Sequence, residues 1–222
     1  MGVFNVKGSV LLFSVMCVMS GCTDGDEIDR KIDSLLKGMT LQEKIGQMNQ
    51  LSGDSNPTGV LKQYSAIEDK VREGKAGTVL NVTGVVNTRE LQRIAVEETR
   101  LGIPLIFALD VIHGYKTISP IPIAESCSWD MAAIEASARV AAVEASASGL
   151  QWTFAPMVDV SRDPRWGRVM EGAGEDAYLG SEIARARVRG FQGDDLSANN
   201  TILACAKHFA GYGASEGGRD YN

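Results

Sequence analysis

Two polar side chains, Lys207 and His208, follow directly on a short run of small and apolar residues, Ile202–Ala206. Such a run suits a β-strand that is buried on both faces, as the inner strands of a parallel sheet are. Gly211 and Gly213 then allow a tight turn that brings the backbone close to whatever lies there. An ammonium and an imidazole at a strand end are typical of α/β binding sites. The alternatives are a lysine whose stem covers the strand end and a histidine satisfied within the core.

Two further groups of polar residues have the same placement after apolar runs. Asp110 ends one run and is followed by His113. A carboxylate there can accept hydrogen bonds from neighbouring hydroxyls of a sugar, or it can cap the turn that follows. Residues 162–168 concentrate arginines around Trp166. Planar guanidinium groups suit directional contacts to hydroxyl oxygens, and a tryptophan can stack on a pyranose. The alternative is a surface ion-pair loop with Trp166 buried as its anchor.

The elements that must position these residues alternate regularly. The apolar runs predict four strands, and the stretches between them predict helices. The strands are at 78–82, 104–110, 151–156 and 202–208, and the helices are at about 87–101, 131–148 and 175–189. Strand and helix alternate without hairpin signals, which predicts parallel strands with right-handed crossovers. We therefore expect an α/β fold, the N-terminal part of a (β/α)8 barrel with about four βα units, in which polar residues after strand ends share one rim.

Capping residues support several of these helices. Thr40 and Glu43 form a capping-box pattern at the start of a helix. Residues 26–51 predict two helical pieces in all, followed by a loop at 52–59. Asp130 is the expected cap of the Ala-rich helix, and Asn87 with Glu90 can cap the helix that ends at Gly102.

The first 22 residues are predicted to be a targeting segment. Lys7 and the apolar stretch 10–19 precede Cys22, and small residues stand directly before that cysteine. This pattern resembles a bacterial lipobox, in which the cysteine is lipidated, and the alternative is an ordinary signal peptide with an incidental Cys22. We expect a tether at 23–27, a domain at 28–222, and an exported protein of the periplasm or outer membrane. Any membrane attachment would be through the lipid alone.

Composition and motif content limit the partners, cofactors and metal sites that the chain could have. The 222 residues carry a formal charge of −6 and no basic run, so we expect no nucleic-acid partner. Cys127 and Cys205 allow a disulfide in an exported protein, although two free thiols are favoured. No dinucleotide fingerprint is present and no cofactor is indicated. A metal-dependent barrel hydrolase would have only Asp110, His113 and His208 as ligands, and no metal site is assigned.

Four motifs in order along the chain resemble the N-terminal domain of glycoside hydrolase family 3. They are the opening at 39–48, Phe-Ala-Leu-Asp-Val-Ile-His-Gly at 107–114, Arg-Asp-Pro-Arg-Trp-Gly-Arg at 162–168 and Lys-His-Phe-Ala-Gly-Tyr-Gly at 207–213. The resemblance implies a β-glucosidase-like hydrolase that removes terminal non-reducing β-D-glucosyl residues from a β-glucoside or oligosaccharide by retaining double displacement. By motif position, Asp110, Arg168, Lys207 and His208 resemble the residues that hold the terminal sugar. Tyr212 stands where the family's N-acetylhexosaminidases carry a histidine, which favours the glucosidases.

One part of the family pattern is missing. The family's nucleophile lies in a Ser-Asp-Trp-like motif that does not occur here, and its acid/base comes from a later region. We therefore expect an N-terminal fragment with sugar-binding residues, no catalytic carboxylate of its own and no significant turnover. The alternative is a non-catalytic sugar-binding lipoprotein. The sequence indicates no oligomeric state.

Overall fold

A computed structural model of the chain describes residues 23–53 and 64–220. The predicted targeting segment, with Cys22 at its end, lies outside the described residues, and so does most of the predicted loop at 52–59. Within the described ranges, no helix has the length and apolar character needed to cross a membrane. Cys127 and Cys205 are both free thiols.

The first helix, α1 (Thr23–Gly38), belongs to a unit of its own that ends at Met39, and a second compact unit begins at Thr40. Residues 23–27 form the first turns of α1, where the sequence predicts a tether. The apolar side chains of α1 at Ile28, Ile32, Leu35 and Leu36 are about half exposed.

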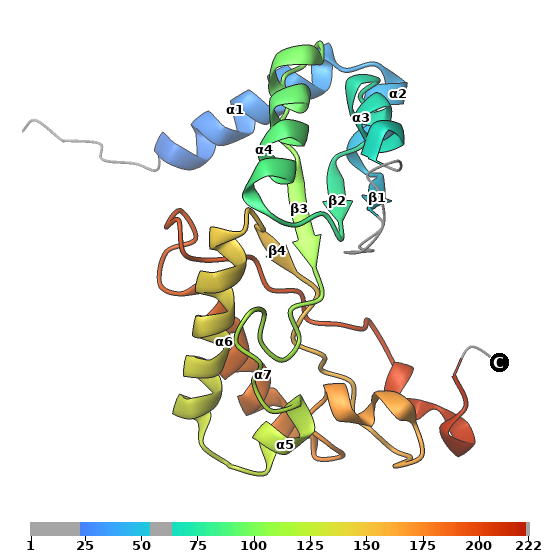
Figure 1. Cartoon of the computed structure of the whole chain (residues 1–222), viewed down its shortest axis with the longest axis vertical. Helices are drawn as coiled ribbons and strands as arrows, with labels where there is room; N and C mark the ends of the chain where they lie inside the picture. The colour runs from blue at the N-terminus through green and yellow to red at the C-terminus, as the bar shows by residue number, and fades with distance from the viewer. Residues whose placement is uncertain (1–22, 54–63, 221–222) are drawn as a thin grey trace, which may run out of the picture. The chain divides into compact units, whose positions relative to one another are not determined.

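Four parallel strands form one sheet in the order β1-β2-β3-β4 (Figure 1). They are β1 (Gln50–Ser52), β2 (Thr78–Leu80), β3 (Ile106–Leu109) and β4 (Trp152–Thr153). Thr78 pairs with both Gln50 and Ile106, and Ala108 pairs with Trp152, so the strands keep one register across the sheet. The prediction of parallel strands joined through helices is confirmed, and the strands at 78–82, 104–110 and 151–156 are present in shorter form.

The first strand was predicted as part of a helix. The capping box is confirmed, because Thr40 Oγ1 accepts from the Glu43 amide and the Glu43 carboxylate accepts from the Thr40 amide. The helix it starts, α2 (Leu41–Gln47), is short, and β1 follows at Gln50. β1 has three residues and one large apolar side chain, Leu51, so it carries no strand periodicity that sequence could show.

The segment after α7 was predicted as a strand buried on both faces, and this is wrong. It runs parallel to β4 and the residues after it and forms backbone hydrogen bonds with them, but the pairing is irregular, with isolated bridges only at Trp152–Leu203 and Met157–Lys207 in the described residues. Pro156 lies between them and has no amide hydrogen to donate, which interrupts a regular ladder. Ile202 is buried, whereas Leu203 is exposed.

The remaining helices either pack against the sheet or lie in the segments that follow the strand ends. They are α3 (Tyr64–Arg72), α4 (Val85–Arg93), α5 (Pro122–Ser126), α6 (Met131–Ala147) and α7 (Ala177–Gln192), with the shorter turns η1 (Ile94–Glu98), η2 (Gly167–Glu171), η3 (Tyr212–Ala214) and η4 (Glu216–Gly218). The predicted cap of α6 is confirmed, because the Asp130 carboxylate accepts from the Ala133 amide. The predicted caps of α4 are wrong. The N-cap of α4 is Gly84. The side-chain amide of Asn87, through Nδ2, donates to the Thr83 carbonyl instead.

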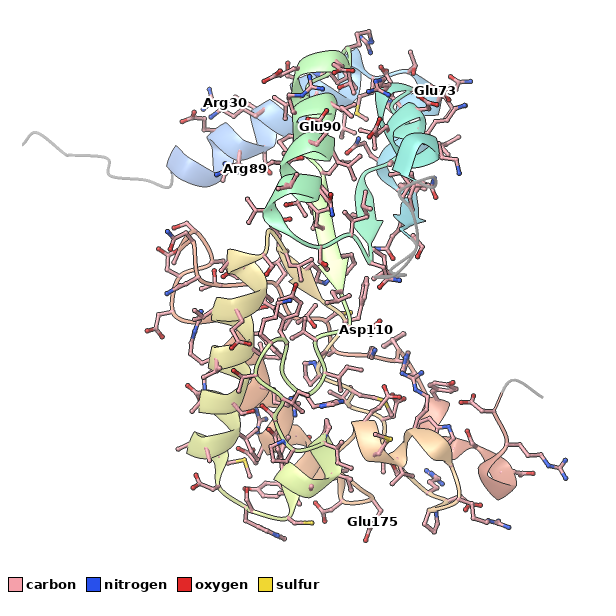
Figure 2. The ribbon with its side chains drawn as sticks, viewed as in Figure 1. Arg30, Glu73, Arg89, Glu90, Asp110 and Glu175 are labelled. Atoms are coloured by element: carbon pink, nitrogen blue, oxygen red, sulfur yellow. The ribbon has the colours of Figure 1, made fainter. Side chains whose placement is uncertain are left out.

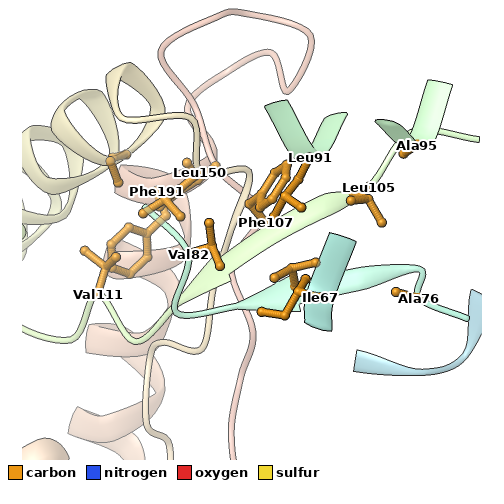
Figure 3. Packing of buried hydrophobic residues seen from close by; sticks show 14 of the residues in the cluster. Ile67, Ala76, Val82, Leu91, Ala95, Leu105, Phe107, Val111, Leu150 and Phe191 are labelled. Carbon is orange, nitrogen blue, oxygen red and sulfur yellow. The ribbon is translucent and has the colours of Figure 1, made fainter. Parts of the chain in front are cut away.

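The core lies between the strands and the inner faces of these helices. Phe107 of β3 is buried with Leu91 of α4, Phe191 of α7 and Ile67 of α3 (Figure 3). Val79 of β2 belongs to the same cluster. Burial of such side chains contributes on the order of 1.5–3 kcal/mol each. The core therefore fixes β3 and β4, and with them the points where the chain leaves the sheet.

Helices α6 and α7 pack closely because small residues line their contact. A Cβ on Gly190 would lie 2.4 Å from the Glu135 carbonyl oxygen and 2.6 Å from Ala138 Cβ. Ile134, Ile183 and Ala186 form a second, smaller cluster between the same helices. The packing of α6 on α7 places Arg187 of α7 within reach of Glu125 in α5 and of the Ile112 carbonyl before α5.

Candidate functional site

Asp110 and Lys207 meet beyond the carboxyl ends of the strands. Asp110 lies where the chain leaves β3 (Figure 2). The Lys207 Nζ donates to Asp110 Oδ1 over 2.6 Å, although 97 positions separate the two residues. They meet because parallel neighbouring segments end on the same edge of a sheet. The Asp110 side chain is 47% exposed and that of Lys207 only 12% exposed, so the carboxylate is the more accessible of the two.

His208 lies beside this pair and is held by Asp159. The imidazole Nδ1 is 2.8 Å from Asp159 Oδ2, and the same oxygen accepts from the His208 backbone amide over 3.0 Å. The Asp159 side chain is almost fully buried, whereas the imidazole is about one-third exposed. His208 is thus a partly accessible ring on a buried support, which differs from a satisfied core histidine.

Arg168 completes the cluster from the turn η2. Its Nε and Nη2 atoms donate to the two carboxylate oxygens of Glu171, each over 2.7 Å. Its Nη1 atom lies 3.4 Å from His208 Nε2. Hydrogen bonding with Glu171 raises the pKa of Arg168, and the same contact lowers the pKa of Glu171. Both groups are therefore charged at neutral pH, and the Arg168 guanidinium stays a hydrogen-bond donor beside His208.

Aromatic rings support Arg168 and His208 from one side. The Arg168 guanidinium lies 5.3 Å from the centre of the Tyr212 ring, a cation–π distance. The rings of His208 and Tyr212 meet edge to face at 4.7 Å. Trp166 is buried, packs against Tyr212, and donates from Nε1 to Asp220. Trp166 is therefore the anchor of its loop, and the alternative of a sugar-stacking ring is wrong for this position.

The glycine turn after His208 closes the cluster, as its sequence predicts. Gly211 adopts a left-handed conformation with φ of 88°. A Cβ on Gly213 would lie 2.2 Å from the Val160 carbonyl oxygen, so only glycine fits there. The Gly213 carbonyl accepts from the Arg162 amide over 3.1 Å. The turn thereby joins the 157–168 loop to the segment that carries Lys207 and His208.

The loop after Asp110 rests on a buried ion pair. Arg187 Nη1 donates to Glu125 Oε2 over 2.7 Å, and Nη2 donates to the Ile112 carbonyl. Ser137 of α6 donates to the other oxygen of Glu125 over 2.6 Å. Burial lowers the pKa of Arg187, although the charge on Glu125 opposes this. The pair connects α5, α6 and α7 to a position two residues beyond Asp110.

The four predicted site residues, Asp110, Arg168, Lys207 and His208, are thus brought together at one edge of the sheet. His113 is not among the contacts of this cluster, and its Nδ1 is buried without a hydrogen-bond partner in the described part of the chain. Among residues 23–53 and 64–220, no group of three or more His, Cys, Asp and Glu side chains is arranged to hold a metal ion.

Sequence reasoning places Asp159 among the polar residues after strand ends but assigns it no role, and it misses Glu171 and the Arg187–Glu125 pair. Glu171 follows Arg168 by three positions, a spacing at which ion pairs form on one helical turn, so a local signal existed. Asp159 directly follows Val158, whose amide pairs with the Lys207 carbonyl. Nothing in the sequence indicates that pairing. The residue pair Arg187 and Glu125 is 62 positions apart and had no local signal.

Known proteins are similar to this chain over most of its length. The model of the glycosyl hydrolase family 3 N-terminal domain matches residues 40–222. The periplasmic β-glucosidase of Salmonella typhimurium is 43% identical over 195 residues, which are 87% of this chain and 25% of that protein. The lysosomal β-glucosidase of Dictyostelium discoideum is 30% identical over 222 residues, with 86% and 27% covered.

Solved structures are similar over the same stretch. The β-glucosidase from Listeria innocua in complex with glucose superposes with a TM-score of 0.76 at 43% identity, covering 87% of this chain and 28% of that one. A mutant of the same enzyme in complex with laminaribiose gives a TM-score of 0.78 at 44% identity, with the same coverage. This chain spans about a quarter of the length of these relatives.

Proposed function

Because the chain belongs to glycosyl hydrolase family 3, whose N-terminal domain it matches over residues 40–222, we propose that it is the sugar-holding part of a β-glucosidase-like hydrolase. The observation that supports this most is the cluster of Asp110, Lys207, His208 and Arg168 beyond the strand ends. Two cationic donors, one carboxylate and one imidazole suit the hydroxyl groups of a terminal β-D-glucosyl residue. Relatives of this chain have been solved with glucose and laminaribiose bound.

The parent reaction would be retaining hydrolysis, which requires a nucleophilic carboxylate and an acid/base about 5–5.5 Å apart. Each carboxylate in this cluster has a cationic or imidazole partner. Asp110 is bonded to Lys207, Asp159 to His208 and Glu171 to Arg168. Each of these contacts uses the carboxylate as a hydrogen-bond acceptor, which suits substrate binding better than delivery of a proton to the leaving group. We therefore assign these residues to substrate binding and none of them to catalysis.

We expect the purified 222-residue chain to bind a β-glucoside without hydrolysing it. Binding of methyl β-D-glucoside can be followed by saturation-transfer NMR, with the mirror-image methyl β-L-glucoside as the control sugar. Hydrolysis can be followed with p-nitrophenyl β-D-glucoside, where we expect no release of nitrophenol above the buffer blank. An equal NMR response to the mirror-image sugar would contradict the binding site. Release at the rate of a full-length β-glucosidase would contradict the absence of catalysis in this chain.

We also propose that the protein is exported and lipid-anchored through Cys22. Support comes from the small residues before Cys22, from the apolar stretch preceding them, and from a relative named as periplasmic. Expression in a Gram-negative host with radiolabelled palmitate should give a labelled, membrane-associated product. The variant Cys22→Ser should lose the label while Cys127→Ser keeps it. A labelled Cys22→Ser product, or an unlabelled wild type, would show that Cys22 is not the acylated residue.

A further inference from the structure

The hydrogen-bonding groups of the site differ in what they can offer a sugar. The Lys207 ammonium and the Arg168 guanidinium only donate, and an ionised Asp110 only accepts. A sugar hydroxyl both donates and accepts, so a site that binds several hydroxyls needs both kinds of partner. His208 is the group whose role is open, because a neutral imidazole has one N–H and one lone pair. Which nitrogen carries the hydrogen depends on the partners of the ring.

The Nδ1 side of the ring faces an acceptor. Asp159 Oδ2 lies 2.8 Å from Nδ1 and also accepts from the His208 backbone amide over 3.0 Å. The Asp159 side chain is 1% exposed, so water does not compete for this oxygen. A carboxylate oxygen already bonded by an amide hydrogen is an acceptor. The geometry on this side of the ring therefore favours a hydrogen on Nδ1.

The Nε2 side of the ring faces a donor. Arg168 Nη1 lies 3.4 Å from Nε2, and a guanidinium has no lone pair to offer. Glu171 bonds the Nε and Nη2 atoms of Arg168 and leaves Nη1 directed at the imidazole. The other charged neighbour is Lys207, whose ammonium is bonded to Asp110, and the Tyr212 ring packs against the imidazole. A proton on Nε2 would point at Nη1, so both sides of the ring favour the same tautomer.

We propose that Asp159 is a positioning residue that holds His208 as the neutral Nδ1–H tautomer, so that Nε2 offers the site a hydrogen-bond acceptor for a sugar hydroxyl. The sugar in this statement rests on the proposed function, whereas the tautomer does not. The Arg168 contact is long for a hydrogen bond. A hydroxyl can therefore donate to Nε2 while Arg168 donates to the oxygen of that hydroxyl or its neighbour. His208 then supplies a second acceptor beside Asp110.

The tautomer can be read directly from the imidazole nitrogens. Two-bond ¹H–¹⁵N correlation spectra of the ¹⁵N-labelled full chain at neutral pH distinguish a protonated from an unprotonated ring nitrogen. The chain has two histidines, so the variant His113→Gln assigns the remaining signals to His208. We expect the wild type to show a protonated Nδ1 and an unprotonated Nε2. A wild-type spectrum with a protonated Nε2, whether in the neutral Nε2–H form or as the imidazolium, would overturn the proposal.

Variants of Asp159 separate positioning from mere packing. Asp159→Ala removes the acceptor, and we expect the Nε2–H form to become populated and the affinity for methyl β-D-glucoside to fall roughly 5–10-fold, the effect of one hydrogen bond. Asp159→Asn keeps an oxygen at the same place and should retain the Nδ1–H form. Asp163→Ala removes a carboxylate of the same loop that pairs with Arg165, and should leave the His208 signals unchanged.

Other outcomes distinguish the two proposals. If Asp159→Ala folds and keeps the wild-type tautomer, Asp159 is not the positioning residue. If Asp159→Ala does not fold, Arg168→Met is used instead. This variant removes the partner on the Nε2 side. An Nε2 that stays unprotonated in Arg168→Met, as in the wild type, then supports Asp159 as the group that fixes the ring. If the wild type has the expected tautomer and binds no methyl β-D-glucoside, the proposed function fails and the tautomer assignment stands.

Discussion

Replacing Arg187 by Met should lower the free energy of unfolding by about 3–5 kcal/mol, the usual effect of removing one partner from a buried ion pair. Both side chains of the Arg187–Glu125 pair are about 5% exposed. Methionine keeps most of the volume of the arginine stem but leaves the Glu125 carboxylate uncompensated in the interior. It also leaves the Ile112 carbonyl without the donor that Arg187 Nη2 provides. Urea denaturation followed by far-UV circular dichroism measures the difference.

Helix α7 offers a matched control for this experiment. Arg185 stands two positions earlier and pairs with Glu182 at the surface, where its side chain is 63% exposed. Arg185→Met should change the unfolding free energy by at most about 0.5 kcal/mol, since exposed pairs contribute little. The double variant Arg187→Met with Glu125→Met should recover much of the loss, because it leaves no buried charge alone. Equal effects of Arg185→Met and Arg187→Met would contradict a buried, charge-dependent role for the pair.

The fold could be predicted from the sequence where one local signal sufficed. The Ala-rich helix α6 has its cap, Asp130, and its terminating glycine, Gly149, within the chain itself. The run at 104–110 is apolar throughout and became β3. β1 was missed because three residues cannot show a period. The 202–208 run looked like an inner strand, but its pairing depends on Pro156, which lies on another segment and cannot donate.

The residues of the candidate site also fall into those with a local sequence signal and those without one. Asp110, Lys207 and His208 were predictable because each follows an apolar run, and parallel strands bring such positions together. Their partners were not predictable. Asp159 and Glu171 are identified as supports of His208 and Arg168 only once the loops are placed in space. For Trp166 the sequence allowed two roles, and the choice depended on Tyr212 and Asp220, which lie more than 40 positions later.

Replacing Lys207 by Met should weaken the binding of methyl β-D-glucoside roughly 10–150-fold, which corresponds to about 1.5–3 kcal/mol for a hydrogen bond to a charged group. Lys207 is the donor that reaches Asp110 at 2.6 Å, and its stem is nearly buried. Methionine retains that stem and removes only the ammonium. Asp110→Asn should weaken binding by a similar factor because the amide offers one acceptor oxygen in place of two. Isothermal titration of the full chain at constant salt measures both effects.

The double variant decides whether the two residues act as a unit. If Lys207 and Asp110 hold neighbouring hydroxyls of one sugar through their shared ion pair, the loss in the double variant should be smaller than the sum of the single losses by at least about 0.5 kcal/mol. Lys116→Met is the matched control, since this exposed lysine lies over the Tyr115 ring outside the cluster. Its affinity should stay within about twofold of the wild type, as surface charges have small effects. Strictly additive losses, or a Lys116→Met effect as large as that of Lys207→Met, would mean that the Lys207–Asp110 contact does not form the sugar-binding unit inferred from its geometry.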